Sequence, residues 1–203
     1  MKALILVDIQ NDFCKGGALE VPGANEIIEG VNDLHREFKE KGDLVILTQD
    51  YHPQNHKSFA SNNEGKEVGE LAELGGKPQV MWPDHCVENT NGAEFHPELN
   101  MLGTVAFFRK GQNPEVDSYS GFYDNDGISS TGLGEYLKKK DVSEVVVVGL
   151  ALDYCVKFTA LDSANEGFKT TVKIPLTRAV NLNKDDDKKA IAELEAAGVV
   201  CEQ

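Results

Sequence analysis

Short apolar runs alternate along this chain with stretches of helical periodicity, and this alternation restricts the possible folds more than any other feature. The runs are nearly continuous, which is typical of strands that are buried on both faces of a sheet. They lie at residues 3–9, 43–50, 104–110, 143–150, 169–175 and 199–202. Helical patterns lie at residues 24–41, 133–140, 154–167 and 184–198. The order predicts the α/β class: a parallel sheet of about six strands with helices on both faces, as in a Rossmann-type three-layer sandwich.

One connection is much longer than the others. Residues 50–103 show little periodicity and are rich in Asn, Gly, Pro and His. A connection of this length inside a compact domain is usually functional. The chain of 203 residues has the length of one domain, which we expect to span residues 1–203. We therefore expect the long loop to carry part of the functional site.

Composition and charge exclude several classes of partner. The formal net charge of −14 would repel nucleic acids and anionic membranes. The N-terminal apolar run ends at Asp8 and no 18-residue apolar stretch occurs, so we expect a cytoplasmic protein, monomeric or homo-oligomeric, that acts on a small molecule. The four cysteines, Cys14, Cys86, Cys155 and Cys201, form no CxxC pair, which argues against a zinc ribbon or a disulfide scaffold.

Chemically reactive side chains stand where the predicted strands end. Asp8, Asp50 and Lys110 follow or close three strands, and Cys155 follows a fourth, at the predicted start of a helix. Ligands of open α/β sheets bind beyond the carboxyl ends of the strands. A helix start favours the thiolate of a cysteine, although a small buried cysteine that only fills the sheet–helix interface is commoner. Asp8 as a base and Lys110 as a cation would favour a nucleophilic Cys155.

The long loop also contains a possible metal site. Asp50 and His52 are two residues apart just beyond a strand, so their side chains can point to the same side of an extended chain. His85 lies near the far end of the loop. One carboxylate and two imidazoles suit Zn(II), Fe(II) or Mn(II), and not calcium. On these residues alone, ordinary surface histidines remain an equally good interpretation.

Five segments together resemble the nicotinamidases of the isochorismatase-like hydrolase superfamily, in order from residue 2 to about residue 180. They read LILVDIQNDFCKGGAL, TQDYHPQNHKSFAS, WPDHCVENTNGAEFHP, FRKGQNPEVDSYSGFYDNDG and VVVVGLALDYCVKFTALDSANEGF. The resemblance implies a catalytic triad of Asp8, Lys110 and Cys155 that acts on an amide. It also implies a cis peptide between Leu150 and Ala151, and an oxyanion hole formed by the backbone N–H groups of Ala151 and Cys155.

The same resemblance implies one divalent transition metal ion, zinc in the first place and iron or manganese as alternatives. Asp50, His52 and His85 would be its ligands. The fourth protein ligand is open between two residues: imidazole is the better ligand for such an ion, which favours His56. The family pattern places the fourth ligand eight residues after the aspartate, which favours Ser58. We predict Ser58, with His56 supporting the loop.

The substrate implied by the resemblance is a small aromatic amide. Phe13, Trp82 and Tyr119 match positions that enclose the pyridine ring in the family, whereas Phe59, Phe95 and Phe122 are expected to serve packing. The activity implied is hydrolysis of nicotinamide to nicotinate and ammonia through a cysteine thioester, in NAD salvage, with pyrazinamide as a further substrate. Two alternatives remain. One is an amidase for another small amide, and the other is a non-haem Fe(II) oxygenase, whose ligand set is also two histidines and a carboxylate.

Overall fold

The computed structural model describes residues 1–203. Its strands and α-helices, in chain order, are β1 (Lys2–Val7), α1 (Ile28–Glu40), β2 (Leu44–Asp50), β3 (Leu71–Leu74), β4 (Lys77–Val80), β5 (Ala106–Lys110), α2 (Leu133–Lys139), β6 (Glu144–Leu150), α3 (Lys157–Asn165), β7 (Lys169–Arg178), α4 (Asp186–Ala196) and β8 (Val200–Glu202). Short 3-10 turns span Asn11–Phe13, Ala24–Ile27, Ala60–Asn62 and Asn91–Ala93, and a π-helical turn spans Leu152–Val156. The six strands predicted from the sequence are all present, with ends that differ by a few residues.

Six strands form one parallel sheet in the order β5-β2-β1-β6-β7-β8. The chain starts in the middle of the sheet, builds outward through β2 and β5, and then returns to place β6 beside β1. The connections therefore diverge at the carboxyl ends of β1 and β6, which is where open α/β sheets bind ligands. Asp8 follows β1 and Cys155 follows β6, and Asp50 is paired with Lys110 at the ends of β2 and β5.

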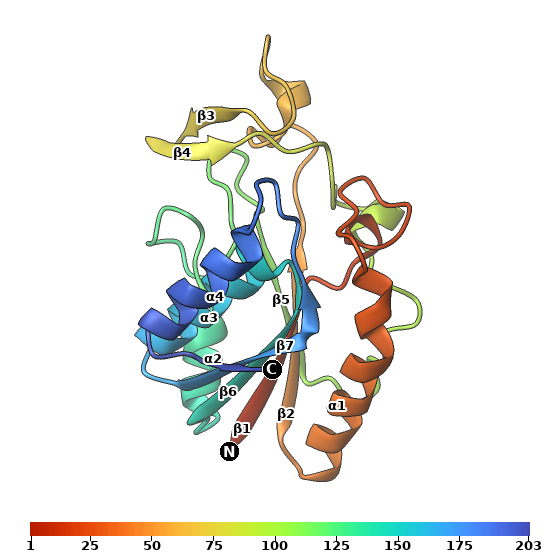
Figure 1. Ribbon diagram of the computed structural model, residues 1–203, viewed down its shortest axis with the longest axis vertical. Helices are drawn as coiled ribbons and strands as arrows, with labels where there is room; N and C mark the ends of the chain where they lie inside the picture. Colours follow the sequence, from red (N-terminus) through yellow and green to blue (C-terminus); the bar gives the residue numbers. More distant parts are fainter.

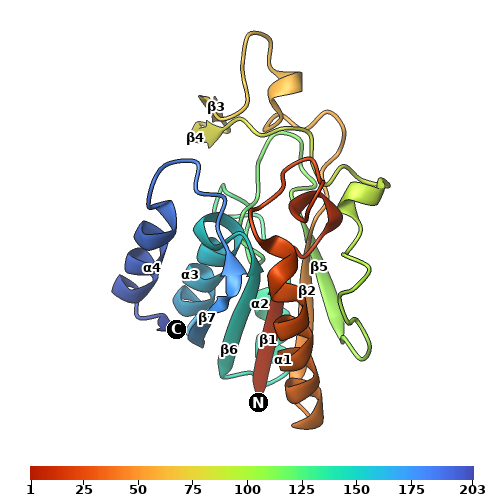
Figure 2. The ribbon, with the colours of Figure 1, turned by 45° about the vertical axis from the view of Figure 1, so that its right-hand side comes forward.

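Helices cover both faces of the sheet, as predicted. Helix α1 lies on one face, and α2, α3 and α4 lie on the other (Figures 1 and 2). Alternate residues of β1 face opposite ways: Leu4 and Leu6 belong to the buried cluster that includes α1, and Ile5 and Val7 to the one that includes the other three helices. The sheet thus separates two apolar cores, because its central strands β1, β2 and β6 are buried on both faces.

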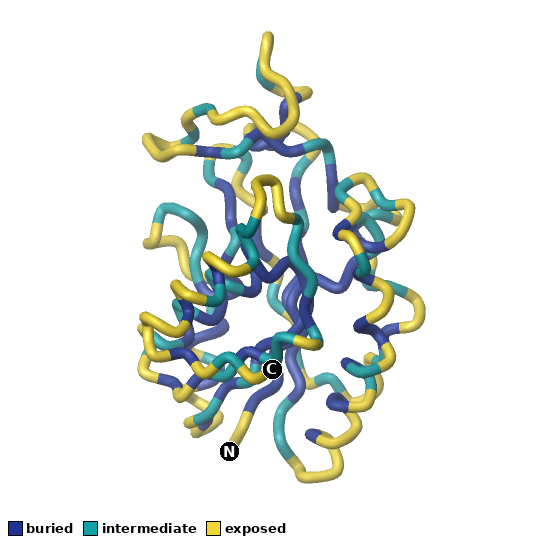
Figure 3. The backbone as a smooth tube through the Cα atoms, in the orientation of Figure 1, coloured by how far each residue is buried: buried dark blue, intermediate teal, exposed yellow.

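The long connection between β2 and β5 is more ordered than the sequence predicted. It contains an antiparallel hairpin of β3 and β4, which lies beyond the carboxyl end of the main sheet (Figure 1). Gly75 and Gly76 form its turn with φ values of 60° and 77°, a left-handed conformation that glycine adopts without strain. The apex of the excursion is exposed, whereas the segments that lead into it and out of it are buried (Figure 3).

No helix in the structure is both long enough and apolar enough to span a membrane.

Candidate active site

Lys110 lies at the centre of a buried group of ionisable side chains. Its Nζ is 3.0 Å from Asp8 Oδ2, 2.5 Å from Asp50 Oδ1 and 3.4 Å from Cys155 Sγ. It also donates a hydrogen bond of 2.9 Å to the carbonyl oxygen of Ser118. The carboxylates of Asp8 and Asp50 and the sulfur of Cys155 lie within 4.8 Å of one another. The structure therefore brings together the three residues that were predicted as a catalytic triad.

The two oxygens of the Asp8 carboxylate have different surroundings. Oδ1 accepts a hydrogen bond of 2.6 Å from the Thr48 hydroxyl, whereas Oδ2 forms an ion pair with the Lys110 ammonium. Burial raises the pKa of Asp8 above its ordinary value, Lys110 and Thr48 oppose this, and the neighbouring carboxylate of Asp50 adds to it. A carboxylate with a raised pKa is a stronger base, so Asp8 can accept a proton from a nearby thiol.

Cys155 differs from the prediction in two respects. It lies in the π-helical turn Leu152–Val156, just before α3, and not in the first turn of an α-helix. The pKa of its thiol is also raised well above the usual range. Burial is the main cause, and the negative charges of Asp8 and Asp50 add to it, which together outweigh the opposing effect of Lys110. The resting side chain is therefore a thiol, although a helix start was expected to favour the thiolate. A neighbouring base is needed to make it a nucleophile.

Side chains of Asp50, His52 and His85 converge beside the buried cluster around Lys110. His52 Nε2 and His85 Nε2 lie 3.6 Å and 3.8 Å from Asp50 Oδ2. The Nδ1 atoms of the two rings lie 2.8 Å from the carbonyl oxygen of Gly111 and 2.7 Å from that of Pro83, so each Nδ1 carries the hydrogen and each Nε2 keeps its lone pair. When both rings are neutral, their Nε2 lone pairs face the Asp50 carboxylate, an arrangement that a bound cation would satisfy. Burial opposes a charge on His52, but without an ion the Asp50 carboxylate raises the pKa of His52 above its usual value. The set fits a divalent transition metal ion.

Asp50 links this metal-type cluster to the triad. Its Oδ1 accepts the hydrogen bond from Lys110, and its Oδ2 faces the two histidines. Burial disfavours its charge, but Lys110 and the two imidazoles more than compensate and hold the pKa of Asp50 below its usual range. The Gln10 side chain fixes the Asp50 backbone, accepting from its N–H at 2.8 Å and donating to its carbonyl at 2.7 Å. Asp50 is thus an anion that is held in place from both sides.

Ser58 and His56, the two candidates for a fourth ligand, contact each other. His56 Nδ1 lies 2.8 Å from Ser58 Oγ and accepts a 3.1 Å hydrogen bond from the Ser58 N–H. Both residues are fully buried, and the His56 Nε2 atom has no hydrogen-bond partner. The nitrogen atoms of His56 group with His52 and Asp117, and not with Asp50 and His85. Burial, with the nearby His52, lowers the pKa of His56 to about 4, so the ring is neutral.

A narrow pocket opens above the reactive sulfur. Its lining includes the three aromatic residues that were predicted to bind the substrate, and these are Phe13, Trp82 and Tyr119. Asp50, His85, Ala151 and Cys155 also line it, so the ring-binding side chains, the metal-type cluster and the sulfur share one space. The peptide between Leu150 and Ala151 is cis, as the resemblance implied. Phe59 packs against the rings of His52, His56 and His85 with centroid distances of 5.4 to 5.6 Å, which agrees with its predicted packing role.

Several residues around the pocket were not predicted from the sequence. They are Gln10, Leu19, Thr48, Asp117, Tyr154 and Val180. Tyr154 directly precedes the candidate nucleophile, and Asp117 lies in the same loop as Tyr119, so proximity to predicted residues was a usable signal for both. The position of Thr48 could also have been inferred, because alternate residues of a strand share a face and Asp50 lies two positions after it. Leu19 and Val180 come from separate loops, and no pattern in the sequence places them here.

Known proteins resemble this chain over its whole length. Residues 2–203 match the family described as the Isochorismatase domain. The nicotinamidase of Escherichia coli is 47% identical over 97% of this chain and 92% of its own length. The solved nicotinamidase/pyrazinamidase of Acinetobacter baumanii is 42% identical and superimposes with a TM-score of 0.95, covering 100% of this chain and 95% of its own.

A second solved structure is that of the pyrazinamidase of Pyrococcus horikoshii in complex with zinc. It is 36% identical, with a TM-score of 0.81, and covers 100% of this chain and 98% of its own. The sheet order and the buried cluster around Lys110 support the same family assignment as these similarities. The chain belongs to the isochorismatase family.

Proposed function

We propose that this protein is a nicotinamidase, which hydrolyses nicotinamide to nicotinate and ammonia and also accepts pyrazinamide. The observation that carries the proposal is the position of Cys155 Sγ, 3.4 Å from Lys110 Nζ and close to the Asp8 carboxylate, in a pocket walled by aromatic rings. The similarity to nicotinamidases over nearly the full chain supports the choice of substrate. Supply of nicotinate for NAD salvage follows as its cellular role.

The first half of the reaction forms a thioester. Asp8 accepts the thiol proton of Cys155, and the sulfur attacks the carboxamide carbon of the substrate. The backbone N–H groups of Ala151 and Cys155 donate hydrogen bonds to the oxyanion that develops on the carboxamide oxygen. Asp8 then returns the proton to the departing nitrogen, and ammonia leaves. Lys110 stays protonated throughout, because nearby carboxylates outweigh burial and raise its pKa well above the usual range.

The second half hydrolyses the thioester. Asp8 is again unprotonated after ammonia leaves, so it can take a proton from an attacking water molecule. The bond between carbon and sulfur breaks, and the proton held by Asp8 returns to the sulfur. Nicotinic acid is released and gives its remaining carboxyl proton to water, which yields nicotinate. Lys110 contacts both Asp8 and Cys155, which stabilises whichever of the two carries the negative charge at each step.

Asp50, His52 and His85 would hold a divalent transition metal ion, with the hydroxyl of Ser58 as the fourth protein ligand. Zinc is our first choice, which the zinc complex of the Pyrococcus horikoshii relative supports. When bound, the ion would supply a Lewis acid for the pyridine nitrogen and so orient the ring. The contact between His56 and Ser58 supports the choice of Ser58, since a hydroxyl that donates to His56 Nδ1 keeps its oxygen lone pairs available.

A panel of amides tests the proposed function. Ammonia release would be measured with nicotinamide, pyrazinamide, benzamide and acetamide under identical conditions, with oxygen consumption recorded in parallel. We expect efficient turnover of the first two amides, weak turnover of benzamide because it lacks the ring nitrogen, and no oxygen uptake. If acetamide or benzamide is hydrolysed as fast as nicotinamide, the protein is an amidase for a different substrate. Oxygen uptake in place of ammonia release would support the oxygenase alternative instead.

A further inference from the structure

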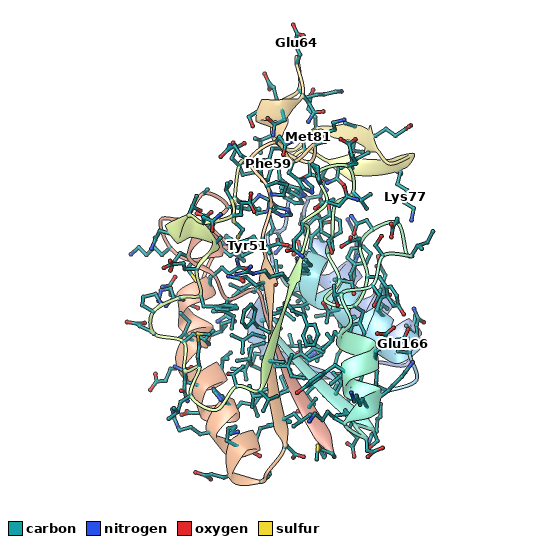
Figure 4. The ribbon with its side chains drawn as sticks, turned by 180° about the vertical axis from the view of Figure 1, so that it is seen from behind. Tyr51, Phe59, Glu64, Lys77, Met81 and Glu166 are labelled. Carbon is teal, nitrogen blue, oxygen red and sulfur yellow. The ribbon has the colours of Figure 1, made fainter.

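Gln79 is a buried side chain on the otherwise exposed hairpin beyond the sheet. It lies on β4, which leads to Met81 and away from Lys77 (Figure 4), and only 3% of it is exposed. Its Nε2 group donates a hydrogen bond of 2.6 Å to Asp117 Oδ2 and one of 2.8 Å to the carbonyl oxygen of Val80. The Tyr119 hydroxyl oxygen lies 3.2 Å from the same nitrogen.

These contacts connect the hairpin to two walls of the active-site pocket. Tyr119 also accepts a hydrogen bond of 3.1 Å from Trp82 Nε1, so Gln79, Tyr119 and Trp82 form one network. Asp117, Tyr119 and Trp82 all line the pocket that contains Cys155. An amide nitrogen has two hydrogens, so the two short bonds use them and the contact to Tyr119 shares one of them. Gln79 itself does not line that pocket.

Gln79 supplies one of the two hydrogen bonds that the buried Asp117 carboxylate accepts. Only 3% of Asp117 is exposed, and its other hydrogen bond is one of 2.8 Å, from the N–H of Ser118 to Oδ1. A buried carboxylate that loses a donor is expected to move towards another donor or towards water. Asp117 and Tyr119 are two residues apart in one loop, so a shift of Asp117 would also displace the aromatic wall.

We propose that Gln79 is a positioning residue, which sets the gap between the walls of the ring pocket through Tyr119 and Asp117. The inference rests on the proposed nicotinamidase function and deepens it. It assigns to the β3–β4 hairpin the recognition of a flat aromatic ring, while the reacting groups remain on the main sheet. Because the walls hold the ring equally in the ground state and the transition state, Gln79 should affect KM and not kcat.

The test uses Gln79→Met, which keeps the shape of the side chain and removes both donor hydrogens. For nicotinamide we expect KM to rise about tenfold, with kcat changed by less than about threefold. Trp82 is the single tryptophan of the chain, so its fluorescence reports on the wall directly. We expect its emission to shift to longer wavelength as the network loosens. Glu73→Gln, at an exposed position of β3 with no side-chain hydrogen bond, is the matched control and should change neither quantity.

A second variant, Gln79→Glu, places a carboxylate against Asp117 and should raise KM further than Gln79→Met at neutral pH. The inference is overturned if both folded variants keep the wild-type KM and emission, or if kcat falls as far as kcat/KM while KM stays constant. Failure of the proposed function looks different, because the wild-type protein itself would then release no ammonia from nicotinamide.

Discussion

At the scale of single residues, the site depends on burying several charges together. Lys110 is fully enclosed, and it is compatible with the interior only because Asp8 and Asp50 lie at 3.0 Å and 2.5 Å from its Nζ. The same enclosure keeps Cys155 as a thiol and raises the pKa of Asp8. The nucleophile is therefore made when the proton moves to Asp8, and it does not exist beforehand. The proton affinity of Asp8 consequently controls the acid side of the pH profile.

The Thr48→Val variant tests this control. Thr48 donates to Asp8 Oδ1 and so lowers the pKa of Asp8, which burial has raised. Activity requires unprotonated Asp8 and is lost as the pH falls through that pKa. Removing the donor should raise the pKa further and move the acid limb of kcat/KM to higher pH by about one unit. Thr170→Val, at a buried strand position bonded to Ser163, is the control and should leave the limb in place. An unmoved limb in Thr48→Val would exclude Asp8 as the titrating base.

At the scale of elements, the sequence predicted the sheet well and the long connection poorly. The strands could be recognised because continuous apolar runs such as 3–9 and 143–150, each bounded by polar residues, are typical of buried strands. The hairpin of β3 and β4 was missed because its strands have four residues each and little apolar periodicity, although the Gly75-Gly76 pair was a recognisable turn signal. The π-helical turn at Leu152–Val156 was missed because its sequence continues without a break into α3.

In the candidate site, the reacting residues could be predicted from the sequence, but several of the contacts that hold them in place could not. Asp8, Asp50, Lys110 and Cys155 could be predicted because parallel strands deliver their carboxyl ends to one edge. The hydrogen bonds from Thr48 to Asp8 and from Gln79 to Asp117 could not be predicted. Each depends on how a strand is aligned with a partner that is distant in the sequence. The metal-type cluster was predicted from ligand chemistry together with the resemblance, and the direction of its imidazole nitrogens is visible only in the structure.

The segment between β2 and the hairpin allows a test of the fourth metal ligand. If the Ser58 hydroxyl is a ligand and His56 only orients it, Ser58→Ala should lower zinc affinity about tenfold, and His56→Ala should lower it less. Competition with a chromophoric chelator measures both affinities without reference to catalysis. Ser61→Ala, an exposed serine bonded to Asp84, is the control. The opposite order, with the larger loss in His56→Ala, would make His56 the ligand.

At the scale of the whole molecule, the proposed metal ligands lie outside the two apolar cores, whereas Cys155 and the pocket residues Phe13 and Ala151 belong to them. These clusters contain 20 and 18 buried residues on the two faces of the sheet, and none of the proposed metal ligands belongs to either. The reacting groups come from the ends of four neighbouring strands, β5, β2, β1 and β6, which the topology places side by side. The fold can therefore persist when the metal ligands are altered or the ion is removed.

Removal of the metal tests this separation. After treatment with a chelator, we expect nicotinamide turnover to be lost while the far-UV circular dichroism spectrum stays unchanged, because both cores are complete without the ion. Addition of zinc should restore turnover. Loss of the circular dichroism signal together with activity would show that the metal site supports the fold itself.

The most direct test of the central claim is the mass of the enzyme during its first turnover. Protein mixed with nicotinamide would be quenched in acid within the first burst of ammonia release, and then digested and mapped. The account predicts a nicotinoyl group on the peptide that contains Cys155, no such group and no ammonia in Cys155→Ala, and normal turnover in Cys14→Ala. A burst of ammonia with the acyl group on Cys14, or on no cysteine at all, would contradict it.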